Sequence, residues 1–237
     1  MTLDALLFDK DGTLFDFDGT WNVWTAEVIA TLSEGDPAIA ARIAEVARFD
    51  LTAQCYLPDS PIIAGTNREA AELMASALPG HDVDALEAYL MASAAEAPLV
   101  PAVALHPFLT GLLGQNLKLG VMTNDSEFSA LRQLEAAEVR DLFHFIAGFD
   151  SGHGAKPAPD PLLAFCSAVD IAPARTAMIG DSTHDLVAGR AAGMITVGVL
   201  TGPADVAELA PYADVVLPDI GHIPAWLSER SGDQKPA

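Results

Sequence analysis

The stretch Leu6-Leu7-Phe8-Asp9-Lys10-Asp11-Gly12-Thr13-Leu14 decides the fold of this chain. Its three leading apolar residues predict a buried central strand, and Gly12 allows the tight turn that follows. Asp9 and Asp11 would then lie at the carboxyl end of this strand, where their charges repel unless a cation sits between them or one is protonated. This arrangement indicates chemistry rather than structure, with one aspartate as a nucleophile, the other as a proton donor and a metal between them.

Three later segments also place polar residues after apolar runs or tight loops. In open α/β sheets ligands bind at the carboxyl ends of the strands, so we expect the segments that end strands to meet at that edge. The residues are Thr123 and Asn124 after the run 119–122, Lys156 after the glycine-rich loop 151–155, and Asp181 and Asp185 after the run 177–180.

The bulk composition limits the classes of function. The chain has 237 residues, which fits one domain with an insertion or two small domains, and 51% are hydrophobic, enough for a substantial core. Lys and Arg number 12 against 33 Asp and Glu, a net charge of −21. Such a charge argues against nucleic-acid partners and anionic membrane surfaces, and we interpret it as favouring solubility.

The sequence also indicates a cytoplasmic protein. No apolar stretch reaches the roughly 20 residues that a membrane span needs. The first residues, 1–4, lack a basic segment and lead directly into the first strand, so we expect no signal peptide. The chain has two cysteines, Cys55 and Cys166, without the spacing of a zinc site or a disulfide framework.

The patterning predicts two units. Residues 16–98 carry apolar residues at helical spacing over 21–32, 37–49, 66–78 and 83–97, the third helix capped by Thr66 or Asn67. Beyond Pro98 strand and helix alternate, with strands expected at 117–122, 143–148, 175–180, 195–199 and 214–217 and helices at 103–115, 126–138, 159–169, 184–192 and 203–210. This alternation predicts an α/β fold with a doubly wound, mainly parallel, Rossmann-like sheet.

We therefore expect three parts. Residues 1–15 and 99–230 form an α/β core, residues 16–98 form an all-helical cap inserted after the first strand, and residues 231–237 form a polar, disordered tail.

The four segments, in this order, resemble the four motifs of the haloacid dehalogenase superfamily. The stretch from Asp181 to Gly193 is similar to the phosphoglycolate phosphatase branch, and an insertion between the first two motifs resembles the helical cap of such phosphatases. An acid two residues after the nucleophile is kept in the phosphatases and phosphomutases of the superfamily and is absent from the enzymes that cleave carbon–halogen bonds.

The resemblance implies a role for each motif residue. Asp9 would be the nucleophile, Asp11 the general acid and base, and Lys156 would offset the charge on the nucleophile and the phosphoryl group. Thr123, Asn124 and the backbone N–H groups of Asp11 and Gly12 would bind phosphate oxygens. Mg²⁺ would be held by the Asp9 carboxylate, the Asp11 carbonyl and Asp181, with Asp185 behind a metal-bound water.

The expected function is hydrolysis of a small phosphomonoester, such as phosphoglycolate or a sugar phosphate, by a monomer or homodimer. The alternatives are a phosphomutase of the β-phosphoglucomutase type and a non-catalytic sensor of phosphorylated metabolites. Neither the substrate nor a carboxylate-binding arginine among Arg42, Arg48 and Arg68 follows from the sequence.

A few residues near the motifs are expected to have no part in the chemistry. Lys10 should point away from the two acids, and His184 should be a solvated loop residue. Trp21 and Trp24, three residues apart on a predicted helix, should belong mainly to the core of the cap.

Overall fold

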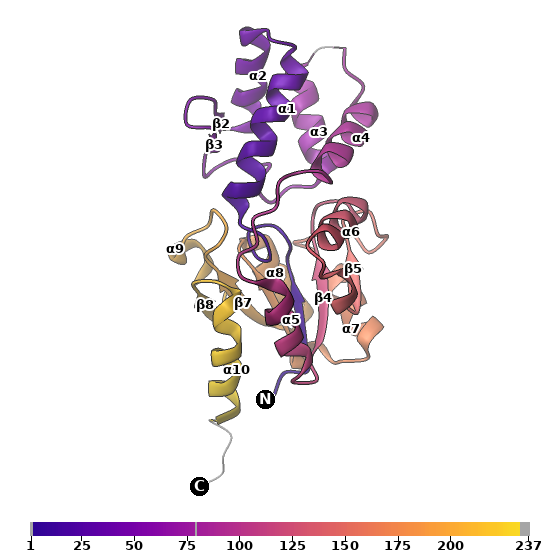
Figure 1. Cartoon of the computed structure of the whole chain (residues 1–237), viewed down its shortest axis with the longest axis vertical. Helices are drawn as coiled ribbons and strands as arrows, with labels where there is room; N and C mark the ends of the chain where they lie inside the picture. The colour runs from indigo at the N-terminus through magenta and orange to yellow at the C-terminus, as the bar shows by residue number, and fades with distance from the viewer. Residues whose placement is uncertain (1, 79, 233–237) are drawn as a thin grey trace.

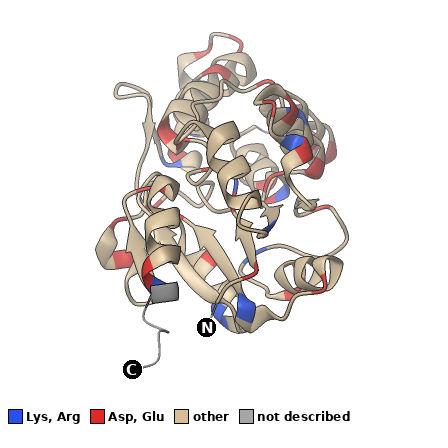
Figure 2. Ribbon diagram, turned by 60° about the horizontal axis from the view of Figure 1, so that its bottom comes forward, with Lys and Arg blue, Asp and Glu red and all other residues tan. Residues whose placement is uncertain are grey.

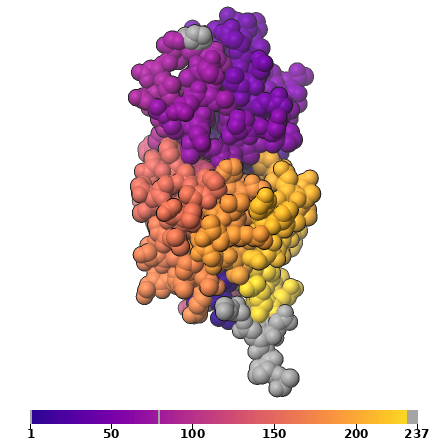
Figure 3. Space-filling view, turned by 180° about the vertical axis from the view of Figure 1, so that it is seen from behind, coloured from indigo at the N-terminus to yellow at the C-terminus, as the bar shows by residue number. Residues whose placement is uncertain are grey.

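The computed structural model describes residues 2–78 and 80–232 and has two lobes (Figure 1). The lower lobe in Figure 1 contains a sheet with helices on both faces, and the upper lobe is a group of helices that follows the first strand. Seen from behind, the upper lobe rests on the strand-bearing lobe along one broad junction (Figure 3). We call these lobes the core and the cap.

Within the described residues the core sheet has six strands, all paired in parallel, in the order β5-β4-β1-β6-β7-β8. This confirms the predicted α/β fold class with a doubly wound parallel sheet. The strands are β1 (Ala5–Phe8), β4 (Lys118–Met122), β5 (Phe145–Ala147), β6 (Thr176–Gly180), β7 (Ile195–Val199) and β8 (Val215–Leu217).

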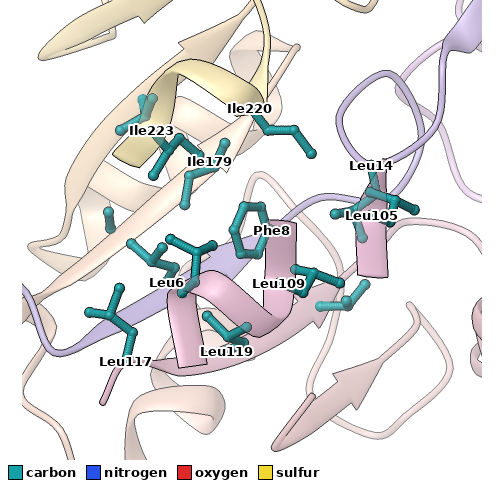
Figure 4. Packing of buried hydrophobic residues seen from close by; sticks show 14 of the residues in the cluster. Leu6, Phe8, Leu14, Leu105, Leu109, Leu117, Leu119, Ile179, Ile220 and Ile223 are labelled. Atoms are coloured by element: carbon teal, nitrogen blue, oxygen red, sulfur yellow. The ribbon is translucent and has the colours of Figure 1, made fainter. Parts of the chain in front are cut away.

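The alternation of side chains along β1 explains why helices cover both faces of the sheet. All four residues of β1 are buried. Leu6 and Phe8 pack with helices α5 (Leu105–Leu113) and α10 (Ile223–Gly232), as Figure 4 shows. Ala5 and Leu7 pack on the opposite face against α7 (Asp160–Val169) and α8 (Thr183–Ala192). A strand buried on both faces is typical of parallel sheets.

The remaining core helices lie in the connections between the strands, except η4 (Ile220–His222), which follows the last strand, where the sequence predicts no helix. They are α6 (Glu127–Ala136), the single-turn α9 (Val206–Leu209) and the short 3₁₀ segments η2 (Arg140–Leu142), η3 (Pro173–Arg175) and η4 (Ile220–His222). Helix α10 is not predicted from the sequence. It extends through Ser231 and Gly232, so the predicted disordered tail is wrong for these two residues, and residues 233–237 lie outside the described residues.

The cap has its own hydrophobic core, whose buried members all fall between Trp24 and Ala97. Its helices are η1 (Asp18–Asn22), α1 (Val23–Ser33), α2 (Pro37–Ala47), α3 (Asn67–Ala77) and α4 (Val83–Ala94). Thr66, one of the two predicted caps, begins α3 in a capping box with Glu69.

The cap departs from the all-helical prediction at one point. A two-stranded hairpin, β2 (Phe49–Asp50) and β3 (Cys55–Tyr56), follows α2. Aromatic side chains favour strands, and Phe49 and Tyr56 are directly paired with their rings 5.3 Å apart. Each of the two strands has only two residues, too few for an alternation of apolar and polar side chains to be recognised in the sequence.

Acidic residues outnumber basic ones on both lobes, and the few lysines and arginines are scattered among them (Figure 2). None of the helices in residues 2–78 and 80–232 combines the length and hydropathy needed to cross a bilayer.

Candidate active site

The site lies where three neighbouring strands end, below the cap. Strand β1 pairs with β4 on one side and β6 on the other, so the residues that follow these strands are adjacent in space. One cavity between core and cap is lined by most of the residues that the motifs predict. From the core these are Asp9, Asp11, Thr123, Asn124, Lys156 and Asp181. Gly12 and Asp185 are buried directly behind this lining.

Lys156 joins the first and fourth motifs. Its Nζ lies 2.8 Å from Oδ1 of Asp9 and 2.6 Å from Oδ1 of Asp185, and all three residues are buried. Asp185 also accepts hydrogen bonds from the backbone N–H and hydroxyl of Ser182, which holds the start of α8. Burial alone would lower the pKa of Lys156, but the carboxylates of Asp185 and Asp9 raise it above its ordinary value. Lys156 is therefore a fixed positive charge at the floor of the cavity.

Asp181 is packed against the loop that follows β1. Gly12 has a φ of +74°, and a Cβ at this position would overlap the Asp181 carboxylate, so only glycine fits both the turn and the packing. Thr13 donates a hydrogen bond to Asp181 across 3.4 Å. The N–H of Gly12 donates to the Phe15 carbonyl at 2.7 Å. This corrects the predicted use of that N–H for phosphate, since it already has an acceptor within the chain.

Three buried carboxylates form a set that fits a divalent cation. Asp9, Asp181 and Asp185 each offer an oxygen, and these oxygens lie within 4.8 Å of one another. An all-oxygen, negatively charged set of this kind matches the preference of Mg²⁺. Burial raises the pKa of Asp9 to about 7, with Lys156 opposing the rise. Burial, followed by the charge of Asp9, also raises the pKa of Asp181 well above its ordinary value. Without a cation Asp9 and Asp181 therefore resist ionisation.

Thr123 and Asn124 are fixed by separate contacts. The Thr123 hydroxyl accepts a hydrogen bond from the N–H of Asp125 at 3.1 Å. The Asn124 amide donates to the carbonyls of Lys156 and of Ala64, a cap residue, both at 2.9 Å. Its backbone N–H has no acceptor among the residues that the structure describes. Asn124 therefore ties the core loop to the cap while its N–H stays available to a ligand.

Lys10 is not where the sequence analysis expected it. The prediction that its side chain points away from the acids is wrong, because Nζ lies 2.7 Å from Asp11 and 3.2 Å from Asp125, with Gln133 as a third partner. The chain turns immediately after Phe8, so strand alternation no longer sets side-chain direction. The ammonium group also lies 5.4 Å from the centre of the Trp21 ring, a cation–π contact.

The contacts of Lys10 connect Asp11 to the cap. Lys10 is fully buried, and Gln133 donates through its amide to the carbonyl of Ala94, the last residue of α4, at 2.7 Å. Burial alone would lower the pKa of Lys10, but Asp11 and Asp125 raise it. Burial also raises the pKa of Asp11, against the opposing effect of Lys10. Lys10 thus fixes the Asp11 carboxyl at the junction of the two lobes.

Lys10→Met is expected to lower the free energy of unfolding by about 3–5 kcal/mol, because removing one member of a buried ion pair leaves its partners uncompensated. The measurement is urea unfolding followed by far-UV circular dichroism. Lys118→Met is the matched control, since Lys118 is half-buried and its side chain forms no ion pair among the described residues. Equal stabilities of the two variants would contradict the assigned contacts.

Several cap-side and loop residues also line the cavity. Trp24 is a buried member of the cap core and Trp21 packs against that core, as predicted, and both also line the cavity. His184, expected to be solvated, is half-buried and lines the cavity from the start of α8. Asn67, which the sequence analysis named only as a possible helix cap, is the first residue of α3 and lines the cavity as well.

Comparison with known proteins agrees with this arrangement. The profile of the family described as Haloacid dehalogenase-like hydrolase matches residues 6–199. A phosphoglycolate phosphatase from Chromobacterium violaceum is 38% identical over 107 residues, which cover 45% of this chain and 47% of that protein. The alignment thus spans about half the length of that relative.

Solved structures share the fold at lower sequence identity. A protein assigned as a haloacid dehalogenase-like hydrolase from Bacteroides fragilis has a TM-score of 0.71 and 21% identity, covering 94% of this chain and 100% of that chain. A protein assigned as a β-phosphoglucomutase from Thermotoga maritima has a TM-score of 0.67 and 19% identity, covering 96% of this chain and 99% of that chain. These likenesses concern the fold alone.

Proposed function

This chain belongs to the haloacid dehalogenase-like hydrolase family, and we propose that it is a Mg²⁺-dependent phosphatase that hydrolyses a small phosphomonoester through an aspartyl-phosphate on Asp9. The observation that carries the proposal is the hydrogen bonding of the Asp9 carboxylate, which leaves one of its two oxygens without a donor. Its Oδ1 accepts hydrogen bonds from the Lys10 N–H at 2.7 Å and from Lys156 at 2.8 Å. Its Oδ2 has no donor among the described residues, which leaves this oxygen to attack phosphorus.

Asp11 is the second group in the chemistry. As a general acid it donates a proton to the leaving oxygen of the alcohol, and as a base it takes one from the water that hydrolyses the aspartyl-phosphate. The raised pKa of Asp11, caused by its burial, favours the protonated form that the first step needs. The contact with Lys10 holds the carboxyl in place for both steps.

Mg²⁺ would be held by the Asp9 carboxylate, the Asp11 carbonyl and Asp181, with Asp185 behind them, and it would orient the phosphate and neutralise its charge. The proximity of the Asp9, Asp181 and Asp185 oxygens supports this assignment.

The other core residues hold the phosphoryl group. Lys156 balances the charge on Asp9 while the bond to phosphorus forms. The Thr123 hydroxyl and the Asn124 N–H donate to phosphoryl oxygens as negative charge develops. The cap excludes bulk water from the first step, and its contact through Asn124 and Ala64 favours the closed arrangement. We further propose that the enzyme acts in the cytoplasm, as a monomer or homodimer, without nucleic-acid or membrane partners.

Phosphate release from a panel of small phosphomonoesters is expected with Mg²⁺ and should fall to background in EDTA, because Asp9 and Asp181 cannot both ionise beside a phosphate without a cation. The measurement is inorganic phosphate against time, with p-nitrophenyl phosphate as a reference substrate. Restoring excess Mg²⁺ to the EDTA sample is the control and should recover the rate. Full activity in EDTA would contradict the proposed metal.

Phosphate release, measured together with ³²P labelling of the protein, separates the alternatives. A phosphomutase would retain label on Asp9, hydrolyse it slowly and respond to a sugar bisphosphate. A non-catalytic sensor would bind phosphorylated ligands without releasing phosphate from any of them.

A further inference from the structure

The cap contributes an apolar wall to the cavity. Its members share aromatic or branched aliphatic side chains: Phe17, Trp21, Trp24, Tyr56, Ile62 and Ile63. The rings of Trp21 and Trp24 stand edge to face at 5.0 Å. The Tyr56 hydroxyl is engaged with Thr25, so this residue presents mainly its ring. Such a wall gains free energy by removing apolar ligand surface from water and accepts flat rings.

The arginines of the cap are engaged away from this wall. Arg48 pairs with Asp59 at 2.8 Å. Arg68 contacts Glu72, Asp84 and Glu87 at 2.6–2.9 Å. Arg42 donates to the carbonyl of Ala77. The substrate carboxylate that a phosphoglycolate phosphatase must bind would therefore find no arginine here.

The core side offers little positive charge beyond what the phosphate needs. Lys156 is the one lysine or arginine among the described residues that line the cavity, and it is bound to Asp9 and Asp185. His184 is the remaining side chain of this lining that can carry a positive charge. A second anionic group on the substrate would thus lie against an apolar wall, where its desolvation is unfavourable.

Two polar residues of the cap, Thr66 and Asn67, also line the cavity. The Oδ1 atom of Asn67 has no hydrogen-bond partner but is itself enclosed by protein atoms, so it offers no acceptor to a ligand. The Thr66 hydroxyl is bonded to Glu69. Neither residue supplies the positive charge that would compensate a buried substrate carboxylate.

We propose that the alcohol released by this enzyme is uncharged, with a ring or branched apolar body that packs against the cap wall. The inference rests on the proposed phosphatase function and narrows its substrate class. It distinguishes this chain from an enzyme for phosphoglycolate, whose alcohol carries a carboxylate and no apolar body.

The test compares three phosphate esters of primary alcohols: phosphoglycolate, ethyl phosphate and 2-phenylethyl phosphate. The phenylethyl ester is expected to have a kcat/KM about 100-fold higher than that for phosphoglycolate, through burial of the phenyl ring. Phosphoglycolate as the preferred substrate would overturn the inference.

Two variants examine the wall directly. Ile63→Arg places a cation on the wall and is expected to raise kcat/KM for phosphoglycolate by about 10-fold. The same variant should lower kcat/KM for the phenylethyl ester. Ile63→Gln, which is polar but uncharged, is the control and should not favour phosphoglycolate.

A binding experiment separates this inference from the phosphatase assignment. Non-hydrolysable 2-phenylethylphosphonate and phosphonoacetate are titrated into the Mg²⁺-loaded protein, with the fluorescence of Trp21 and Trp24 as the signal. Tighter binding of 2-phenylethylphosphonate supports the inference even if no ester is hydrolysed, in which case only the proposed function fails. Tighter binding of phosphonoacetate overturns the inference, whether or not p-nitrophenyl phosphate is hydrolysed.

Discussion

Asp9→Asn is expected to lower kcat by a factor on the order of 10⁴–10⁶, the range seen when a catalytic nucleophile is removed from a site that otherwise stays intact. The amide nitrogen of asparagine is not a nucleophile for phosphorus, and its oxygen carries no full negative charge. The contacts of Oδ1 with Lys10 and Lys156 can be kept by the amide oxygen, so the fold should persist. The measurement is phosphate release with Mg²⁺, together with ³²P labelling of the protein.

Asp4→Asn is the matched control for this variant. Asp4 lies just before β1, at the opposite end of the strand from Asp9, and its partner Arg175 is exposed. Loss of such a surface pair changes stability by about 1 kcal/mol or less and should leave turnover intact. Labelling of Asp9→Asn at the wild-type level would remove Asp9 from the role of nucleophile.

Asp9→Asn should also be more stable than the wild type when no metal is bound. The pKa of Asp9 is about 7 in the folded protein and about 4 when unfolded, so between these values the folded state binds more protons. Stability of the wild type therefore falls as pH rises through this window, whereas asparagine has no such dependence. In EDTA the melting temperature of Asp9→Asn should exceed that of the wild type by about 5 °C at pH 7.5 and by little at pH 4. A constant difference would contradict the raised pKa.

Adding Mg²⁺ should reverse this order, because a cation that binds the folded state stabilises it and the wild type offers one more charged ligand. Thermal unfolding at pH 7.5 with and without Mg²⁺ measures the effect. An identical response of both proteins would indicate that Asp9 does not bind the metal.

The sequence predicts the sheet because the signals for it are local. Each of β1, β4 and β6 is a short apolar run followed at once by the polar residues Asp9, Thr123 and Asp181, and parallel pairing then brings those ends together. The convergence of these motif residues around one cavity follows from strand order alone. Helix α10 was not predicted because its apolar stretch is short. Polar residues soon follow Ile223 and Trp226, and a glycine lies near each end of the helix.

Contacts between distant segments were not predictable in the same way. Lys10 follows the first strand by two positions, and nothing nearby shows that Asp125 and Gln133 will surround it. The unpaired oxygen of Asn67 depends on how α3 meets the core loops. Three-dimensional packing decides these partners, and it also decides that Arg48 and Arg68 pair with acids of the cap.

Lys156→Met is expected to lower the free energy of unfolding by about 3–5 kcal/mol, because it leaves two buried carboxylates without their shared cation. Asp9 and Asp185 both lie within 2.8 Å of Lys156, and methionine keeps the length of the side chain without its charge. Turnover should fall by about 10²–10³-fold, the effect of losing one group that stabilises developing charge. Urea unfolding in EDTA and phosphate release with Mg²⁺ measure the two effects. Arg175→Met, which breaks an exposed pair with Asp4, is the control and should change neither by much.

A second substitution separates the effect on stability from the effect on chemistry. In Lys156→Met/Asp185→Asn one of the two uncompensated charges is gone, so stability should recover by about half of what the single variant loses. Turnover should stay at the level of the single variant, because Asp9 still reacts without the positive charge beside it. Recovery of turnover together with stability would mean that Lys156 acts only through the fold. Recovery of stability alone would mean that Lys156 neutralises the nucleophile during phosphoryl transfer, the role that its two contacts support.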